Sequence, residues 1–336
     1  MAAGGLAPAC DDSGPTGTRS ADPGACPPPG PGVQVGGTGS RRPDTPADPV
    51  RRVVLMGGGP EEDAAATGFA EAAGGGDLVI LRVTGSRASY PGYFLRTLAP
   101  DPAPATAVTV QTLEPRAADD PAVLCRVARA EAIWLAGGDQ WDYLGRWPPE
   151  LHEALAQAGA RGAAVGGTSA GAMVLGAAVF DAREGPVSSP EALADPLGPA
   201  TRLSYPAFAA PELDGVVVDS HLGARDREGR LVVFLARFLA ETDRPHVTGV
   251  GLDEGVALVV EAGRYQVLGP GGRGAHLYRL EGPVRHPAGV PLELDRIQRV
   301  RLEPGSEGAW PPDWQQMATV ELRVRNGRVE RVPPPG

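Results

Sequence analysis

The feature that most restricts the fold is a series of short apolar segments that alternate with helical ones. The apolar runs span residues 53–56, 77–83, 107–113, 132–135 and 163–165. Helices are predicted between most of them, over residues 61–73, 119–130 and 150–158. Strands that are apolar on both faces and alternate with helices form a parallel sheet covered on both sides. We therefore predict an α/β fold with a doubly wound, mostly parallel sheet.

Glycine and proline divide the chain into three parts. The sequence contains 47 Gly and 36 Pro, and ten of each lie within residues 1–50, which have no aromatic residue. Such a segment cannot bury enough apolar surface to offset its ordering entropy, so we predict that residues 1–50 are disordered. Residues 51–262 are predicted to form the main domain. Strand patterns with frequent Gly and Pro predict a β-rich extension, packed on this domain, over residues 263–336.

The charged residues exclude several functions. All 31 basic residues are Arg, so mechanisms that need a lysine, such as a P-loop, a pyridoxal Schiff base or a Ser-Lys dyad, are excluded. The net charge of −10 argues against nucleic acid as a partner. No apolar run approaches the about 18 residues of a membrane span.

The cysteines indicate neither a zinc site nor a compartment. Cys10 and Cys26 lie in the Pro/Gly-rich segment, and Cys125 is expected to be a small core residue of a helix. No Cys-x-x-C or Cys/His cluster occurs, so no structural zinc is predicted. Residues 6–10 resemble the end of a bacterial lipoprotein signal but lack its basic and apolar parts. We expect a cytoplasmic location, or a secreted or lipid-anchored one if translation starts farther upstream.

Glycine or small polar residues follow four of the predicted strands. These segments are residues 57–59, 137–140, 166–171 and 219–221. In open α/β sheets the ligand crevice lies beyond the carboxyl ends of the strands, so the four segments are expected to converge on one site.

The segment with the clearest chemistry is a G-x-S-x-G motif at residues 167–171, between a strand and an apolar helix. In this context the motif predicts a nucleophile elbow that presents Ser169 at the top of the sheet. The N–H of Ala170 is expected to face an oxyanion, and Gly138 is the best candidate for the second donor. The abundance of Gly, Ser and Ala leaves open that the motif arises by chance.

A nucleophilic serine needs a base and a carboxylate. Of the five histidines, only His221 ends a core-type strand, whereas His152, His246, His276 and His286 lie on a helix edge, in a loop or in the β-rich extension. His221 is therefore the predicted base, although a core imidazole bonded to backbone is the alternative. Asp253 and Glu254 are both candidates for the orienting carboxylate, because they follow a short strand. Of the two, Glu254 is preferred.

Three arginines follow the predicted base. Arg225, Arg227 and Arg230 lie just before or at the start of a predicted helix over residues 231–240. They would bind a substrate carboxylate through paired N–H donors. The alternative is a surface helix start in which Asp226 and Glu228 neutralise them.

Taken together, these motifs resemble the cyanophycinase branch of the S51 serine peptidases. The resemblance rests on GGG, GGDQ, GGTSAGA, D-x-H-x-x-x-R-x-R-x-x-R and G-x-G-x-D-E, which occur in this order between residues 51 and 260. It implies a fold like that of the class I glutamine amidotransferases, which is flavodoxin-like.

The resemblance also implies roles for individual residues. Ser169 would be the nucleophile, His221 the base and Glu254 the carboxylate, with oxyanion donors from Gly138 and Ala170. The pocket for a β-aspartyl-arginine unit would be lined by Gln140, Asp219, Arg225, Arg227 and Arg230. No metal or organic cofactor is needed, the substrate is a peptide, and a homodimer is expected. Ser220 stands where cyanophycinases carry glutamine, and its shorter side chain cannot make the same contacts, which puts cyanophycin itself in question as the substrate.

Two other functions remain open at this point. An α/β-hydrolase esterase would use the same elbow. In that family the triad histidine follows the serine and the acid in the sequence, so the base would have to be His276 or His286. A binding module that has kept the scaffold but lost turnover is the other alternative.

Overall fold

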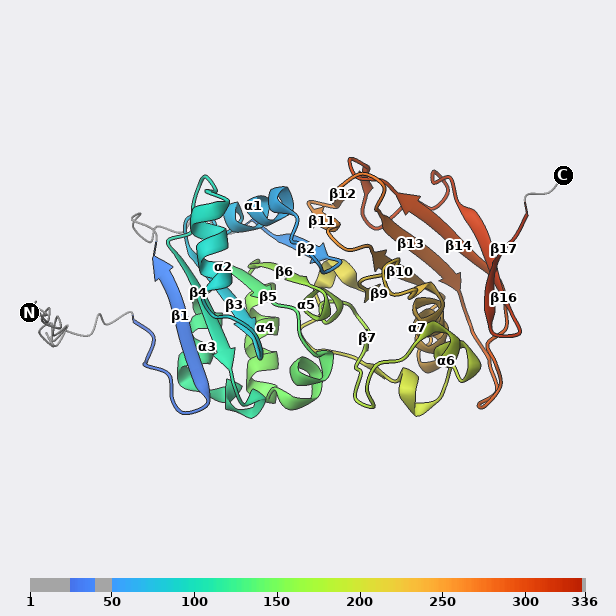
Figure 1. Ribbon diagram of the computed structural model, residues 1–336, viewed down its shortest axis with the longest axis horizontal. Coiled ribbons are helices and arrows are strands. Elements are labelled where there is room, and N and C mark those ends of the chain that lie inside the picture. Colours follow the sequence, from blue (N-terminus) through green and yellow to red (C-terminus); the bar gives the residue numbers. More distant parts are fainter. Residues whose placement is uncertain (1–24, 40–49, 334–336) are drawn as a thin grey trace, which may run out of the picture.

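The computed structural model describes residues 25–39 and 50–333, which form an α/β part and an adjoining β-rich part (Figure 1). The segment 6–10 and Cys10 lie outside the described residues, as do 40–49 and the last three residues. No helix in the described ranges is long and apolar enough to cross a membrane.

The largest sheet has nine strands in the order β1-β4-β3-β5-β6-β2-β11-β12-β15. The strands from β4 to β2 run parallel, whereas those at both ends pair antiparallel. In sheet order, the bounds are Val33–Gly39, Thr106–Thr112, Asp77–Arg82, Ala132–Leu135, Ala164–Thr168, Arg52–Met56, Ala257–Glu261, Arg264–Leu268 and Glu307–Ala309. The mixed α/β fold with a large, centrally parallel sheet confirms the predicted fold class.

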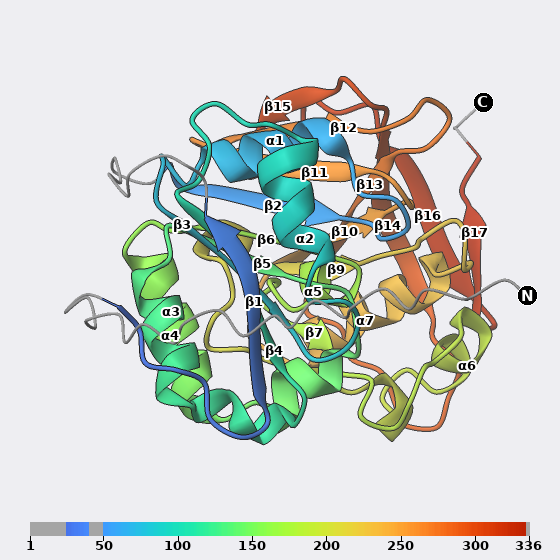
Figure 2. The same ribbon diagram turned by 60° about the vertical axis from the view of Figure 1, so that its left-hand side comes forward.

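Helices cover both faces of this sheet, as its apolar strands require. In β2, Val53 and Leu55 belong to the core on one face, and Val54 and Met56 to the core on the other. This alternation follows from the two-residue period of a strand. Helices α3 and α4 lie on one face and α1 on the other (Figure 2), and the short π-helix η1 packs into the same cluster as α1. Their bounds are Pro121–Arg129, Pro149–Ala160, Asp63–Glu71 and Tyr93–Thr97.

A second sheet has six strands in the order β17-β16-β14-β13-β10-β9. In that order the bounds are Arg328–Arg331, Val320–Arg325, Leu294–Leu302, Ala275–Glu281, His246–Leu252 and Val216–Asp219. The long helix α7 (Glu228–Glu241) packs on β9 and β10, and α6 (Ser189–Ala194) packs on α7.

The shorter elements connect these layers. Strands β7 and β8 form a two-stranded sheet, α5 follows β6, and the remaining elements are α2, the 3₁₀-helix η2, the π-helix η3, and the 3₁₀-helices η4 and η5. Their bounds, in the order just given, are Val179–Phe180, Leu203–Ser204, Ala170–Met173, Ser89–Gly92, Pro115–Asp119, Asp142–Arg146, Pro199–Thr201 and Pro211–Leu213.

The predicted β-rich extension is shared between both sheets. Strands β12 and β15 complete the nine-stranded sheet, whereas β13, β14, β16 and β17 continue the second sheet from β10. The boundary expected at residue 262 falls in the turn between β11 and β12, which pair as neighbours. We therefore propose that the extension and the main domain form one folding unit.

Part of the N-terminal segment is ordered, in contrast to the predicted disorder of residues 1–50. Strand β1 pairs antiparallel with β4 over its whole length, from Val33 opposite Thr112 to Gly39 opposite Thr106. The backbones approach so closely that a Cβ on Gly37 would lie 2.5 Å from the Ala107 carbonyl oxygen. Backbone pairing at the edge of an existing sheet compensates for the few apolar side chains of this segment.

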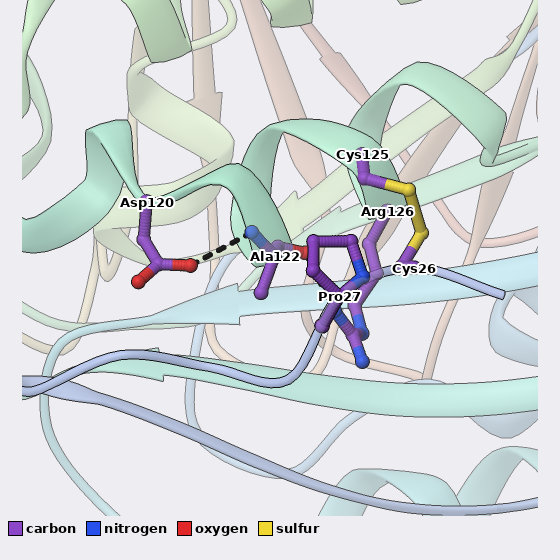
Figure 3. The surroundings of a disulfide bond; sticks show 6 residues. All are labelled: Cys26, Pro27, Asp120, Ala122, Cys125 and Arg126. Atoms are coloured by element: carbon purple, nitrogen blue, oxygen red, sulfur yellow. Dashed lines mark hydrogen bonds between the residues drawn. A yellow bond between two sulfur atoms is a disulfide. The ribbon is translucent and has the colours of Figure 1, made fainter. Parts of the chain in front are cut away.

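A disulfide holds the chain just before β1. Cys26 is bonded to Cys125 in α3 (Figure 3), so Cys125 is not the free core cysteine expected from the sequence. The Gly30 N–H also donates to the Asp120 carboxylate (2.8 Å), which in turn caps α3 at Ala122 N. The bond closes a loop with a sequence separation of 99 residues. A native disulfide of this kind contributes about 2–4 kcal/mol to stability.

Candidate active site

Four loops at the carboxyl ends of β2, β6, β9 and β10 are joined by backbone hydrogen bonds. The Ser169 N–H donates to the Met56 carbonyl (3.0 Å), and the His221 N–H donates to that of Gly57 (2.9 Å). The Gly255 N–H donates to Gly58 (2.8 Å). The loop that follows β2 therefore lies between the segments that carry Ser169, His221 and Glu254.

The glycines of this central loop leave room for the side chains around it. Gly58 has a φ of +84°, and a Cβ on it would lie 2.3 Å from the imidazole of His221. A Cβ on Gly57 would lie 2.1 Å from the carbonyl oxygen of Asp253. Any other residue at either position would displace the neighbouring loop, which explains in physical terms why glycines follow β2.

Ser169 occupies a strained turn between β6 and α5. Its φ of 52° and ψ of −120° are unusual for a residue with a side chain, and such backbone strain costs about 1–3 kcal/mol. The turn is tight because a Cβ on Gly167 would lie 2.5 Å from the Gly171 carbonyl carbon. A strained, tightly packed turn between a strand and a helix is the geometry that a nucleophile elbow requires, and the elbow itself stays a prediction.

Ser169, His221 and Glu254 are joined by consecutive hydrogen bonds. The Oγ of Ser169 lies 2.8 Å from Nε2 of His221, and Nδ1 of the same ring lies 2.6 Å from Oε1 of Glu254. The His221 side chain is only 7% exposed and that of Glu254 is 29% exposed. The structure thus brings together the three residues that the sequence singled out.

The electrostatics favour a neutral imidazole beside an ionised carboxylate. Burial lowers the pKa of His221, the hydrogen bond with Glu254 opposes this shift, and Arg225 and Arg227 reinforce it. The hydrogen bond from His221 lowers the pKa of Glu254. A neutral Nε2 is able to accept the proton of the serine hydroxyl, and the carboxylate stabilises the imidazolium that results.

One predicted oxyanion donor, Ala170, directly follows the serine, and the segment that carries the other, Gly138, packs against the serine turn. Ala170 is the first residue of α5, where the backbone N–H of a helix has no partner within the helix. The segment before Gly138 packs on the elbow, since a Cβ on Gly137 would lie 3.5 Å from the Cβ of Ser169. Tyr143 supports this segment by donating its hydroxyl to the Ala136 carbonyl (2.8 Å).

Two residues expected to line the pocket are instead buried and paired with each other. Arg230 donates from Nε to Oδ2 of Asp219 (2.8 Å) and from a terminal nitrogen to Oδ1 (2.6 Å). Asp219 has no exposed surface and Arg230 is 2% exposed, with its guanidinium near the rings of Phe180 and Phe234. The expectation that they line the pocket is therefore corrected: they form the support beneath the His221 turn. A sequence cannot show that two opposite charges 11 residues apart satisfy each other.

The other predicted pocket residues differ in how accessible they are. Arg225 is exposed, and its guanidinium makes no hydrogen bond or ion pair with the described part of the chain. Arg227 is partly buried and donates to the Ser220 carbonyl (2.9 Å), and burial lowers its pKa to about 10. Gln140 is partly exposed and its amide lies 3.5 Å from the Phe180 carbonyl oxygen. Ser220 is fully buried, with its hydroxyl directed at the Met173 sulfur.

Sequence reasoning missed a second set of polar residues beneath the site. Asp253 accepts hydrogen bonds from the backbone of Gly223 and Gly274, and it contacts His276. No sequence motif predicts this contact, because the pattern around His276 indicates only a β-strand. Within residues 25–39 and 50–333, no three His, Cys, Asp or Glu residues are grouped so as to hold a metal ion.

The sequence matches a peptidase family and two cyanophycinases. Peptidase family S51 matches residues 104–268. The cyanophycinases of Synechococcus elongatus and Thermosynechococcus vestitus are each 32% identical to this chain over 160 residues. That alignment covers 46% of this chain and 44% of each relative, so it spans less than half of either protein.

A solved peptidase from an acI-B1 actinobacterium is 20% identical, with a TM-score of 0.49 over 78% of this chain and 98% of that protein. The region matched to the family contains Ser169, His221 and Glu254. Residues 104–268, just under half of the chain, thus match peptidase family S51, and the chain aligns with less than half the length of the cyanophycinases that it resembles.

Proposed function

We propose that this chain is a serine peptidase that cleaves peptide or isopeptide bonds at aspartyl residues, with Ser169, His221 and Glu254 as its catalytic triad. The observation that carries the proposal is the unbroken line of hydrogen bonds from the serine hydroxyl through the imidazole to the carboxylate. The match of residues 104–268 to peptidase family S51 supports the same reaction class.

The reaction follows from this geometry. Ser169 Oγ attacks the carbonyl carbon of the scissile bond while its proton moves to Nε2 of His221. The N–H groups of Gly138 and Ala170 stabilise the oxyanion. When the C–N bond breaks, the imidazolium gives its proton to the leaving amine. A water molecule then hydrolyses the acyl-serine ester, with His221 again acting as the base.

The aspartyl specificity rests on the charge beside His221. Arg225 is exposed with a free guanidinium, and Arg227 lies next to it on the same turn. Guanidinium groups bind carboxylates through paired N–H donors, so an acidic side chain next to the scissile bond fits this surface. The relatives at 32% identity are cyanophycinases. Since Ser220 is fully buried with its hydroxyl against Met173, it offers a substrate no polar group, and we propose a small aspartyl peptide as well as cyanophycin as candidate substrates.

The esterase alternative is disfavoured by the same contacts. It requires His276 or His286 beside the serine, whereas His276 contacts Asp253 and His286 contacts the Val290 carbonyl. His221 is the histidine that meets Ser169.

The test is to incubate the protein with cyanophycin and with a panel of α- and β-aspartyl dipeptides, and to identify products by mass spectrometry. We expect cleavage on the carbonyl side of an aspartyl residue, and none with Ser169→Ala. Products from cyanophycin would show that Ser220 is tolerated. Thermal stabilisation by these ligands without any product would contradict the proposal and favour the binding module.

We also propose that the protein works in an oxidising compartment rather than in the cytoplasm expected from the sequence. The supporting observation is the Cys26–Cys125 disulfide, because such bonds persist in oxidising environments and are rare in the cytosol. Alkylation of free thiols in intact cells that express the protein from its native gene should leave both cysteines unmodified. Modification of both without added reductant would contradict this location. A homodimer remains a prediction.

A further inference from the structure

The carboxylate next to Glu254 joins the two turns that carry the base and the acid. We call residues 221–223 the base turn and residues 253–255 the acid turn. Oδ1 of Asp253 accepts a hydrogen bond from the Gly223 N–H (3.0 Å), and Oδ2 accepts one from the Gly274 N–H (3.0 Å). The base turn is also held by backbone hydrogen bonds from Leu222 N to Leu252 O and from His221 N to Gly57 O, and by the His221–Glu254 contact itself. Asp253 thus supplies a side-chain connection between the turns.

His276 holds this carboxylate from the second sheet. Its Nε2 lies 3.4 Å from Oδ2 of Asp253, and Arg299 donates to its Nδ1 over 2.9 Å. A neutral imidazole that accepts at Nδ1 carries its proton on Nε2, so the N–H is directed at the carboxylate. The side chain of His276 is 7% exposed and that of Asp253 is 15% exposed, which shields the contact from water.

The chain of contacts continues to the start of α7. Arg299 lies 3.2 Å from Glu228, and the Tyr278 hydroxyl donates to the same carboxylate (2.8 Å). Glu228 begins α7, which packs on β9 and β10, the strands that lead into the base and acid turns. Side-chain contacts therefore connect the second sheet to α7, and α7 packs on the two strands that lead into the base turn and the acid turn.

Asp253 is ionised at neutral pH. Burial alone would raise its pKa, but the hydrogen bonds from His276 and from the backbone of Gly223 and Gly274 outweigh it and lower the pKa to about 2. Neither Asp253 nor His276 is hydrogen-bonded to Ser169. Their contacts are with the framework that holds the reacting residues.

We propose that Asp253 and His276 are positioning residues that fix the distance between His221 Nδ1 and the Glu254 carboxylate. The inference rests on the triad of the proposed function and adds two residues that it does not contain. Displacing a reacting group by about 1 Å lowers turnover by about 10²-fold. Loss of the link between the turns should therefore reduce kcat more than it changes KM, because the Arg225 guanidinium makes no hydrogen bond or ion pair with Asp253 or His276.

A pH profile separates positioning from simple stabilisation. The charged groups that act on the His221 imidazole are Glu254, which raises its pKa, and Arg225 and Arg227, which lower it. If the Glu254 contact loosens, the pKa of His221 falls, and the acidic limb of the rate profile moves to lower pH. A variant that is merely less stable would keep the wild-type limb at temperatures where it is folded.

The experiment uses Asp253→Asn, His276→Gln and His276→Ala in the full chain. The rate at which a fluorophosphonate labels Ser169 is measured from pH 4 to 9, because this probe reports on the nucleophile without a known substrate. Hydrolysis of the best peptide from the panel then separates kcat from KM. Thermal unfolding shows which variants are folded under the conditions used. The matched control is Asp214→Asn, which also removes a paired carboxylate but lies before β9, at its opposite end.

We expect Asp253→Asn and His276→Ala to label about 10²-fold more slowly, with the acidic limb at lower pH. His276→Gln, which keeps a donor near the carboxylate, should recover part of the rate. Wild-type rates and limbs in folded variants would overturn the positioning role. If Asp253→Asn does not fold, the two His276 variants decide. If the wild type itself fails to label, it is the proposed function that fails.

Discussion

Replacement of Ser169 by alanine is expected to lower kcat/KM by about four orders of magnitude or more. The hydroxyl that lies 2.8 Å from His221 is the only nucleophile that the proposed mechanism provides. Alanine accepts the strained backbone at this position as well as serine does, so stability should change by less than about 0.5 kcal/mol. Hydrolysis of the best peptide from the panel and urea unfolding of the same samples measure both effects.

The matched control is Ser306→Ala. Ser306 lies in a loop next to β15 and its hydroxyl makes no hydrogen bond in the described part of the chain, so the variant should keep wild-type turnover. Turnover by Ser169→Ala within tenfold of wild type would remove this serine from the mechanism. A loss of rate accompanied by a loss of several kcal/mol in stability would show that the elbow had collapsed instead.

The position of the candidate site could be predicted because it depends on local rules. Glycines after apolar runs mark the ends of parallel strands, and such ends share one edge of the sheet. That argument placed Ser169 and His221 in neighbouring loops, where the structure has them. The choice of Glu254 over Asp253 could be made but not explained, because it depends on which of two adjacent carboxylates faces the imidazole.

Most of the features that escaped prediction depend on a partner far away in sequence. Strand β1 is ordered by its pairing with β4, about 70 residues later, and Cys26 by its bond to Cys125. His276 takes its role from Asp253 on another strand end. Asp219 and Arg230 were expected to face a substrate, because composition does not show whether two charges pair with each other or with a ligand.

Breaking the buried Asp219–Arg230 pair is expected to cost about 3–5 kcal/mol of stability. Arg230→Met removes both guanidinium bonds, and the Asp219 carboxylate then remains fully buried with only its own neighbour Ser220 N–H and the more distant Arg227. Arg230→Lys keeps the charge but cannot form two parallel bonds, so its cost should be smaller. Urea unfolding of the three proteins gives the free energies of unfolding.

The control for this prediction is an ion pair on the surface. Arg244 forms the same two-bond contact with Asp214, but the two side chains are 43% and 66% exposed, so Arg244→Met should cost less than about 1 kcal/mol.

The double variant Asp219→Asn/Arg230→Met should lose less stability than the sum of its single changes, because neither charge is then left unpaired. If Arg230→Met instead kept wild-type stability and raised KM, Arg230 would be a pocket residue, as the family resemblance implies. The burial of this pair makes a loss of stability the expected result, since a side chain that water does not reach contacts a substrate only if the base turn opens.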